Sequence, residues 1–251
     1  MTATIERGAS TAPVASREPG KRAKRKKPGG FLTSSSGKKV IMAITGAVMV
    51  VFLVGHMVGN LKIFVGRDSF DEYALALRTM LEPLAPYRAL LTIVEVVLVV
   101  SVGLHMWAAV SLARRARAAR PVKYVAKKSQ ARGYTTHIMR YGGVTILLFL
   151  IWHLLDLTFG VVNPKGFDAS PADRMIAGFD PSRWWVTLLY VVGTVMLGLH
   201  LRHGVWSAFQ TLGWAGRDRD KVLRLGAALL SAVLVAGFLT PPLAITFGVI
   251  K

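Results

Sequence analysis

The chain has 251 residues, 53% of them hydrophobic, and a formal net charge of +19 at pH 7. Its apolar residues fall into five long blocks with the charges between them. Because about 20 apolar residues are needed for a helix to cross a bilayer, this pattern predicts an integral membrane protein with basic loops and argues against a nucleic-acid-binding protein. The sequence has no cysteine, which excludes disulfide bonds and zinc or iron–sulfur sites built from its own thiolates.

The first 37 residues differ from the rest of the chain. They are rich in Ala, Ser, Pro and Gly and contain the basic run Lys21–Lys27. Such a segment buries too little apolar surface to offset its ordering entropy, so residues 1–37 are predicted to form a disordered, basic, lipid-facing tail. A secretory signal peptide is not expected, since the next apolar stretch is too long and lacks a small-x-small cleavage site. Residues 38–251 are predicted to form the transmembrane domain.

Five transmembrane helices are predicted, at about 39–65, 87–113, 138–161, 185–211 and 222–249. The fifth has no histidine or charged residue between Leu225 and Ile250, and the pair Pro241-Pro242 is expected to kink it. We therefore expect an all-α protein in which the first four helices form a bundle and the fifth packs at its periphery.

Two further features indicate where the chain meets the membrane surface. Apolar residues at helical spacing predict an amphipathic surface helix between the first two spans; they are Phe70, Tyr73, Ala74, Leu77 and Leu81. Trp184 and Trp185 stand at the entry of the fourth span, as interfacial aromatic residues do.

The loop charges predict the orientation. The segment Arg114–Arg132 has eight Lys or Arg and no acid, whereas Lys62–Arg88 has four basic and four acidic residues and Lys165–Arg183 has three of each. Because Lys and Arg accumulate in cytoplasmic loops, the tail and the loops 114–137 and 212–221 are predicted to be cytoplasmic. The C-terminus is then extracytoplasmic.

One histidine lies within each of the first four predicted helices. His56, His105, His153 and His200 are separated by 49, 48 and 47 residues. With a rise of about 1.5 Å per residue, His56 and His153 lie roughly 25 and 20 Å from the cytoplasmic ends of their helices. His105 and His200 lie only roughly 13 and 15 Å from theirs. These depths predict an outer pair, His56 with His153, and an inner pair, His105 with His200.

Paired histidines at two depths indicate metal ligation. A single histidine on a membrane helix often only hydrogen-bonds to a neighbouring carbonyl, but polar groups inside the bilayer are costly and usually functional. Two facing imidazoles complete the axial coordination of a b-type haem in a helix bundle, so two haems are expected among the first four helices. Nearby glycines would let a macrocycle approach the backbone, and they suit close helix packing equally; they are Gly55, Gly59, Gly103, Gly193 and Gly198.

Other polar residues are weaker candidates. His203 follows His200 by one turn and is a candidate spare ligand, haem-propionate partner or quinone contact. Asp156 lies one turn beyond His153, and Glu95 lies at about the level of the outer pair. A buried carboxylate at the position of Glu95 suggests proton handling near a quinone; a structural hydrogen bond is an equally good explanation.

Three segments resemble a known family. They are Phe52–Asn60 (FLVGHMVGN), Trp152–Asp156 (WHLLD) and His200–Ser207 (HLRHGVWS). The resemblance is to the cytochrome b membrane-anchor subunit of bacterial succinate dehydrogenase, in its single-anchor form with five helices and two haems. It extends over about residues 35–250, and the four histidines and the Gly-x-Trp-Ser run make it specific.

The resemblance implies a function as the membrane subunit of respiratory complex II. A flavoprotein and an iron–sulfur subunit would dock on the cytoplasmic face of the bacterial cell membrane and pass electrons from succinate through this chain to quinone. His105 and His200 would ligate the haem nearer the clusters, and His56 and His153 the haem further out. The resemblance leaves the location of the quinone open; the candidate contacts are Asn60, Glu95, Asp156, Trp206 and Ser207.

Three alternatives stay open on the sequence alone. The chain could be a dihaem cytochrome b that anchors another dehydrogenase, such as a formate dehydrogenase or a hydrogenase, although those lack the His200–Ser207 segment. It could be a non-redox membrane protein whose histidines relay protons. One pair could instead supply the histidine half of a Rieske-type [2Fe–2S] centre, with the two cysteines coming from a partner subunit.

Overall fold

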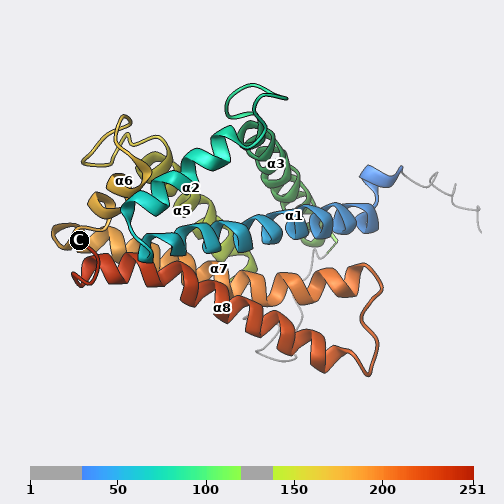
Figure 1. Cartoon of the computed structure of the whole chain (residues 1–251). Coiled ribbons are helices and arrows are strands. Elements are labelled where there is room, and N and C mark those ends of the chain that lie inside the picture. The colour runs from blue at the N-terminus through green and yellow to red at the C-terminus, as the bar shows by residue number, and fades with distance from the viewer. Residues whose placement is uncertain (1–29, 120–137) are drawn as a thin grey trace, which may run out of the picture.

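The structure of the protein is a computed structural model that describes residues 30–119 and 138–251. Residues 1–29 of the predicted tail and residues 120–137 of the predicted 114–137 loop lie outside the described residues. Every regular element within them is helical (Figure 1). The α-helices are α1 (Ser35–Leu61), α2 (Arg67–Thr79), α3 (Ala89–Ala118), α5 (Gly143–His153), α6 (Pro171–Gly178), α7 (Trp184–Thr211) and α8 (Asp220–Thr246). Short 3₁₀ turns lie at Phe31–Thr33, Lys62–Phe64 and Pro181–Arg183, and π-helical turns at Ile138–Gly142 and Leu154–Thr158.

Five helical stretches in the described chain are long and apolar enough to cross a membrane. They are Ser35–Phe64, Ala89–Ala118, Met139–Thr158, Pro181–Thr211 and Asp220–Thr246. These stretches confirm the prediction of an all-α multi-pass membrane protein, and they agree with the predicted spans to within a few residues. Large apolar side chains such as Val51, Val99 and Leu229 stay exposed on them, as expected for surfaces that contact lipid.

Helix ends follow from local chemistry. The Ser34 side chain accepts a hydrogen bond from the Gly37 amide at 2.9 Å, which is an N-cap interaction. As a result α1 begins at Ser35, inside the segment predicted to be tail. The predicted surface helix corresponds to α2, and α7 begins at Trp184 as expected from the interfacial tryptophans.

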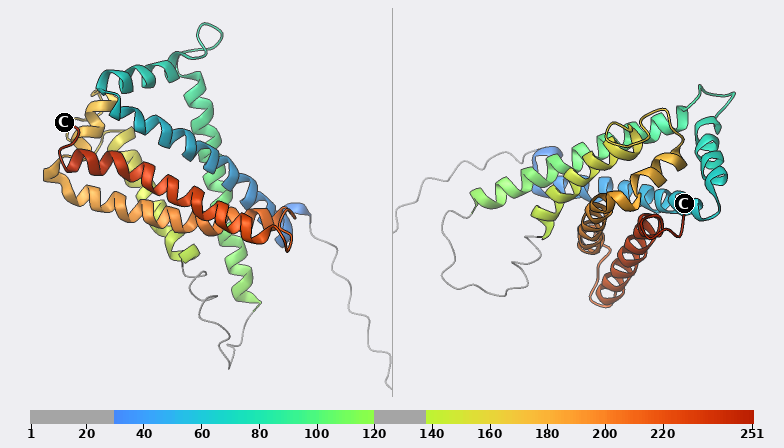
Figure 2. Two further views of the ribbon diagram at one scale, coloured as in Figure 1. Left: turned by 60° about the horizontal axis from the view of Figure 1, so that its bottom comes forward. Right: turned by 90° about the vertical axis from the view of Figure 1, so that its left-hand side faces the viewer.

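The spans pack in an unequal arrangement. Helix α1 runs alongside α3, α7 and α8, while α5 packs on α7, and α7 and α8 form the most extensive pair (Figure 1 and Figure 2). The last helix, predicted at the periphery, therefore packs on both α1 and α7, and it continues through Pro241-Pro242 to Thr246. Of the five spans, α3 is the one that diverges from the others, with α1 as its main neighbour.

Hydrogen bonds between side chains hold α3 against α1 at the end of the bundle where α1 begins. This end is called the N-terminal end. The Lys38 ammonium is buried and donates to the Ser111 hydroxyl at 2.5 Å, with the Trp107 ring 5.1 Å away. The Arg115 guanidinium donates to the Ser35 hydroxyl at 3.4 Å. Because these contacts join residues far apart in sequence, they set the register of α3 along α1.

The opposite end holds the C-terminus and is called the C-terminal end. Helices α2 and α6 cover it, and together they are called the cap (Figure 1). Helix α6 packs against α2 and against the π-helical turn Leu154–Thr158. The main buried apolar cluster lies here and combines α2, α6, α7 and α8; its members are Ile63, Phe70, Ala172, Met175, Phe179, Val186, Tyr190 and Ile245. Apolar burial therefore stabilises mainly the region beyond His56 and His153.

Candidate cofactor sites at two histidine pairs

The structure brings the four mid-helix histidines together in the two pairs expected from their depths. His56 of α1 and the last residue of α5, His153, have ring centroids 5.8 Å apart and ring planes at 85°. His105 of α3 and His200 of α7 have ring centroids 6.3 Å apart and ring planes at 54°. Each pair thus joins two helices that are far apart in the sequence.

The ring spacing suits a shared metal ion. Two imidazoles that bind one ion from opposite sides through bonds of about 2 Å have ring centroids about 6 Å apart. Among the described residues, α1 with α5 and α3 with α7 are not pairs that pack extensively. The histidines of each pair therefore reach toward each other across a separation that the helix backbones do not close.

Aromatic side chains surround the pair nearer the C-terminal end. Phe52 stacks on His56 at 5.2 Å, Phe238 of α8 lies 5.8 Å from His56, and Phe149 lies 6.1 Å from His153. A cavity of about 140 Å³ adjoins the pair, and its lining comprises His56, Asn60, Phe70, His153, Leu157, Thr158, Pro171 and Met175. Of the candidate quinone contacts, Asn60 is the one that lines this cavity.

Hydroxyl groups contact one histidine of each pair. The Tyr190 oxygen lies 3.2 Å from His153 Nδ1, and Thr45 Oγ1 lies 3.2 Å from His105 Nδ1. His200 Nδ1, by contrast, is buried without a hydrogen-bond partner among the described residues. Neither Thr45 nor Tyr190 was among the residues predicted from the sequence; the available signal was a polar residue inside each of two predicted membrane helices.

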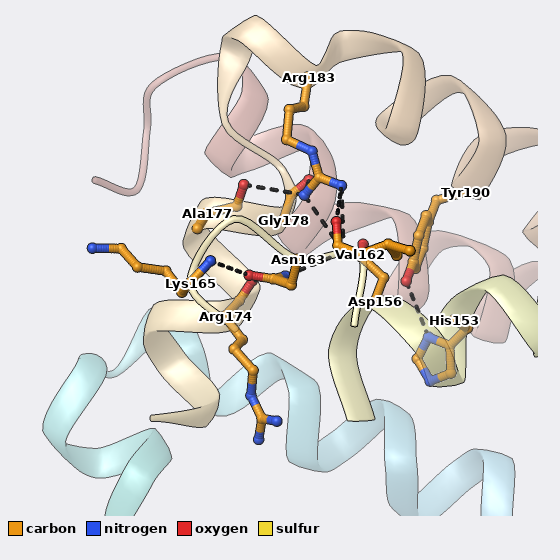
Figure 3. Close-up of polar contacts among 10 residues, drawn as sticks. All are labelled: His153, Asp156, Val162, Asn163, Lys165, Arg174, Ala177, Gly178, Arg183 and Tyr190. Atoms are coloured by element: carbon orange, nitrogen blue, oxygen red, sulfur yellow. Dashed lines mark hydrogen bonds and ion pairs between the residues drawn. The ribbon is translucent and has the colours of Figure 1, made fainter. Parts of the chain in front are cut away.

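Asp156 lies in a buried network at the C-terminal end (Figure 3). Its carboxylate is fully buried, and Oδ1 accepts from Asn163 Nδ2 at 3.2 Å and from the Arg183 guanidinium at 3.4 Å. Arg183 also donates to the carbonyls of Val162 and Gly178, both at 3.2 Å. This network ties the loop after the third span to the start of α7. Neither Arg183 nor Asn163, the partners of Asp156 in this network, was among the residues predicted from the sequence.

The cap holds a second arginine, which is buried. Arg174 of α6 is 8% exposed and donates to the Thr158 carbonyl at 2.9 Å. Burial and the neighbouring Arg78 lower its pKa, while Asp71 opposes this shift. Because Arg174 bonds to the last residue of the π-helical turn, it joins α6 to the end of the third span.

The π-helical turn places Asp156 within this network. Such turns are uncommon and occur mostly as single-turn insertions, often at functional sites. Here the turn Leu154–Thr158 follows His153 directly. Sequence analysis predicted an uninterrupted helix over 138–161 and therefore could not locate the Asp156 side chain relative to its partners.

The remaining candidates lie apart from the two ring pairs. Glu95 pairs with Arg88 at 3.0 Å, and both side chains are about half exposed. The Trp206 indole donates to Asp220 at 2.8 Å. Arg224 lies 3.8 Å from the Trp206 ring centroid.

His203 and Ser207 lie on the same turns of α7 as Trp206. The His203 ring is 5.7 Å from the Trp206 ring, and the Ser207 carbonyl accepts from the Thr211 hydroxyl at 3.0 Å. The Trp206 indole N–H, one of the candidate quinone contacts, is already bonded to Asp220 and in this way links α7 to α8.

Comparisons of the chain with protein-family models, with curated protein sequences and with solved structures give no match.

Proposed function

We propose that this chain is the cytochrome b membrane-anchor subunit of a bacterial succinate:quinone oxidoreductase. One b-type haem would be held by His105 and His200 and a second by His56 and His153. The observation that carries the proposal is the facing of two histidine pairs, with ring centroids 6.3 and 5.8 Å apart, between helices that do not pack extensively on each other. Four histidines that only satisfied neighbouring carbonyls would not need to meet in pairs.

The residues present fit this cofactor in their donor set. Two neutral imidazoles would supply two nitrogen ligands for the iron, and the hydrogen bonds that side chains make to the paired rings in the described chain involve Nδ1. The cavity of about 140 Å³ beside His56 and His153 is smaller than a typical ligand site of about 300–1,000 Å³. A macrocycle therefore also requires the two helices of a pair to stay apart, as these helices do. Bound haem would supply one-electron transfer.

The likeness of three segments to the succinate dehydrogenase anchor supports the choice of electron donor and acceptor. Basic residues gather where α1 begins and α3 ends and in the turn before α8; they include Lys39, Arg114, Arg115, Arg117, Arg217 and Arg219. Since Lys and Arg mark the cytoplasmic side, this end would face the cytoplasm and receive the flavoprotein and iron–sulfur subunits. His105 and His200 are the pair nearer that end, so electrons would enter there.

The proposal is tested on the intact complex, purified from membranes through a tag after Lys251. Two b-type haems per chain, co-purification of a flavoprotein and an iron–sulfur subunit, and haem reduction by succinate are expected. Reduction by formate or hydrogen instead would indicate the anchor of another dehydrogenase. A chain without haem or iron would indicate a non-redox protein, and iron with acid-labile sulfide but no haem would indicate a histidine-ligated [2Fe–2S] centre.

The orientation gives a separate prediction. A reporter inserted after Gly216, in the turn between α7 and α8, is expected to be cytoplasmic, and one fused after Lys251 extracytoplasmic. The reason is that α8, which lies between these points, is long and apolar enough to cross the membrane once, while the basic residues lie at the end where α8 begins. Alkaline phosphatase and green fluorescent protein fusions measure the two sides. Both reporters on one side would contradict the prediction.

A further inference from the structure

We propose that Thr45 and Tyr190 are positioning residues, each of which holds one histidine of a pair in the tautomer that leaves Nε2 free to bind a metal. Thr45 would act on His105 and Tyr190 on His153. This inference rests on the proposed haem function of the pairs and goes beyond it, because it assigns the groups that set ring direction. Outer partners of metal-binding histidines usually accept the N–H of the non-ligating nitrogen, which fixes the ring and raises its basicity.

The hydrogen bonds around Thr45 fix the direction of donation. Its hydroxyl donates to the Ile41 carbonyl at 2.7 Å, one turn earlier in α1. With its proton engaged there, Thr45 Oγ1 can only accept from His105 Nδ1, 3.2 Å away. An accepting Thr45 oxygen requires a proton on Nδ1, so the neutral His105 ring carries its lone pair on Nε2.

The Tyr190 hydroxyl is held in place by aromatic packing. Its ring makes edge-to-face contacts with Phe149 and Phe179, with centroids 5.0 and 4.7 Å away, and the residue is 5% exposed. The hydroxyl therefore stays 3.2 Å from His153 Nδ1 (Figure 3). When Nε2 binds a metal, Nδ1 carries the proton and donates a hydrogen bond to the Tyr190 oxygen.

A hydroxyl that accepts in this way needs somewhere to donate. Asp156 Oδ2 is buried and has no hydrogen-bond partner among the described residues. Asp156 is near enough to interact electrostatically with Tyr190. A bridging water between Tyr190 and Asp156 would satisfy both groups, and it would connect the carboxylate to His153 through the phenol.

The two pairs therefore share one design. In each, one ring contacts a hydroxyl on a neighbouring helix: His105 contacts α1, and His153 contacts α7. The opposite ring, His56 or His200, has no such hydroxyl contact in the part of the chain that the structure describes, and His200 Nδ1 is buried without a partner. Loss of a positioning hydroxyl should consequently affect one haem and spare the other.

The first experiment compares Thr45→Val, Thr45→Ser and a matched control in the purified complex. Thr240→Val is the control, because the Thr240 hydroxyl bonds its own helix at 2.7 Å in the same way but contacts no histidine among the residues that the structure describes. Thr45→Val should raise the midpoint potential of the His105–His200 haem, since a ring that donates no N–H bond to Thr45 stabilises ferric iron less. It should also weaken haem retention about 10–100-fold. Thr45→Ser should restore both values.

The second experiment uses Tyr190→Phe, which keeps the ring. The His56–His153 haem should shift to a higher potential and be retained about 10–100-fold less well, with the other haem unchanged. Two normal haems in the wild type, with potentials and retention unaltered in both Thr45→Val and Tyr190→Phe, would overturn this inference while leaving the proposed function standing. No haem in the wild type would overturn the proposed function itself. If Tyr190→Phe fails to fold, the comparison of Thr45→Val with Thr240→Val decides the matter.

Discussion

Replacing His200 with alanine is expected to remove one of the two haems and leave the other in place. About half of the reduced-minus-oxidised haem absorbance should be lost, because the alanine leaves His105 without its axial partner. His105→Ala should give the same result. His56→Ala and His153→Ala should remove the other haem, since the two levels differ by roughly 7–10 Å along the bundle and one iron cannot bind ligands from both. Variants of His105 or His200 should also lose succinate-driven quinone reduction.

His203→Ala is the matched control for this series. His203 lies one turn from His200 on the same helix and contacts the Trp206 ring at 5.7 Å. It is expected to keep both haems and most of the activity. Spectra recorded during a redox titration distinguish the two haems by their midpoint potentials. Unchanged spectra and activity in all four single variants of the paired histidines would contradict the assignment of these histidines as haem ligands.

Replacing Arg183 with glutamine is expected to be the most destabilising single change at the C-terminal end. Arg183 and Asp156 form a 3.4 Å ion pair whose side chains are 13% and 0% exposed. Removing one partner of a buried pair leaves an uncompensated charge and costs about 3–5 kcal/mol of unfolding free energy. The carbonyls of Val162 and Gly178 also lose their donor. Denaturant unfolding in detergent micelles measures the loss.

Arg67→Gln supplies the control, because Arg67 forms an ion pair of similar length, 3.3 Å, with Asp173 at the same end of the bundle. Those side chains are about half exposed, and an exposed pair contributes about 0–1 kcal/mol. The double variant Asp156→Asn with Arg183→Gln should lose less than the sum of the single losses, since the unpaired charge disappears. Equal stability of Arg183→Gln and Arg67→Gln would show that the Asp156 network does not hold the cap.

The sequence by itself determined the class of fold and the grouping of the histidines. Five apolar blocks near the length of a bilayer span predict five membrane-spanning helices, and the described residues contain five helical stretches that are long and apolar enough to span. Depth is also local information, because each residue adds a fixed rise along a helix. The distances of His56, His105, His153 and His200 from charged helix ends were therefore enough to sort them into the two pairs that meet in the structure.

Only the tertiary structure decided which helices are neighbours and which groups complete each site. Hydrophobicity does not distinguish a lipid-facing side from a helix-facing side when both are apolar, so the packing of α8 on α1 and the contact of Phe238 with His56 could not be predicted. The bonds from Thr45 to His105 and from Tyr190 to His153 join residues 60 and 37 positions apart. Such contacts depend on the rotation of each helix about its axis, and that rotation is set by packing between helices.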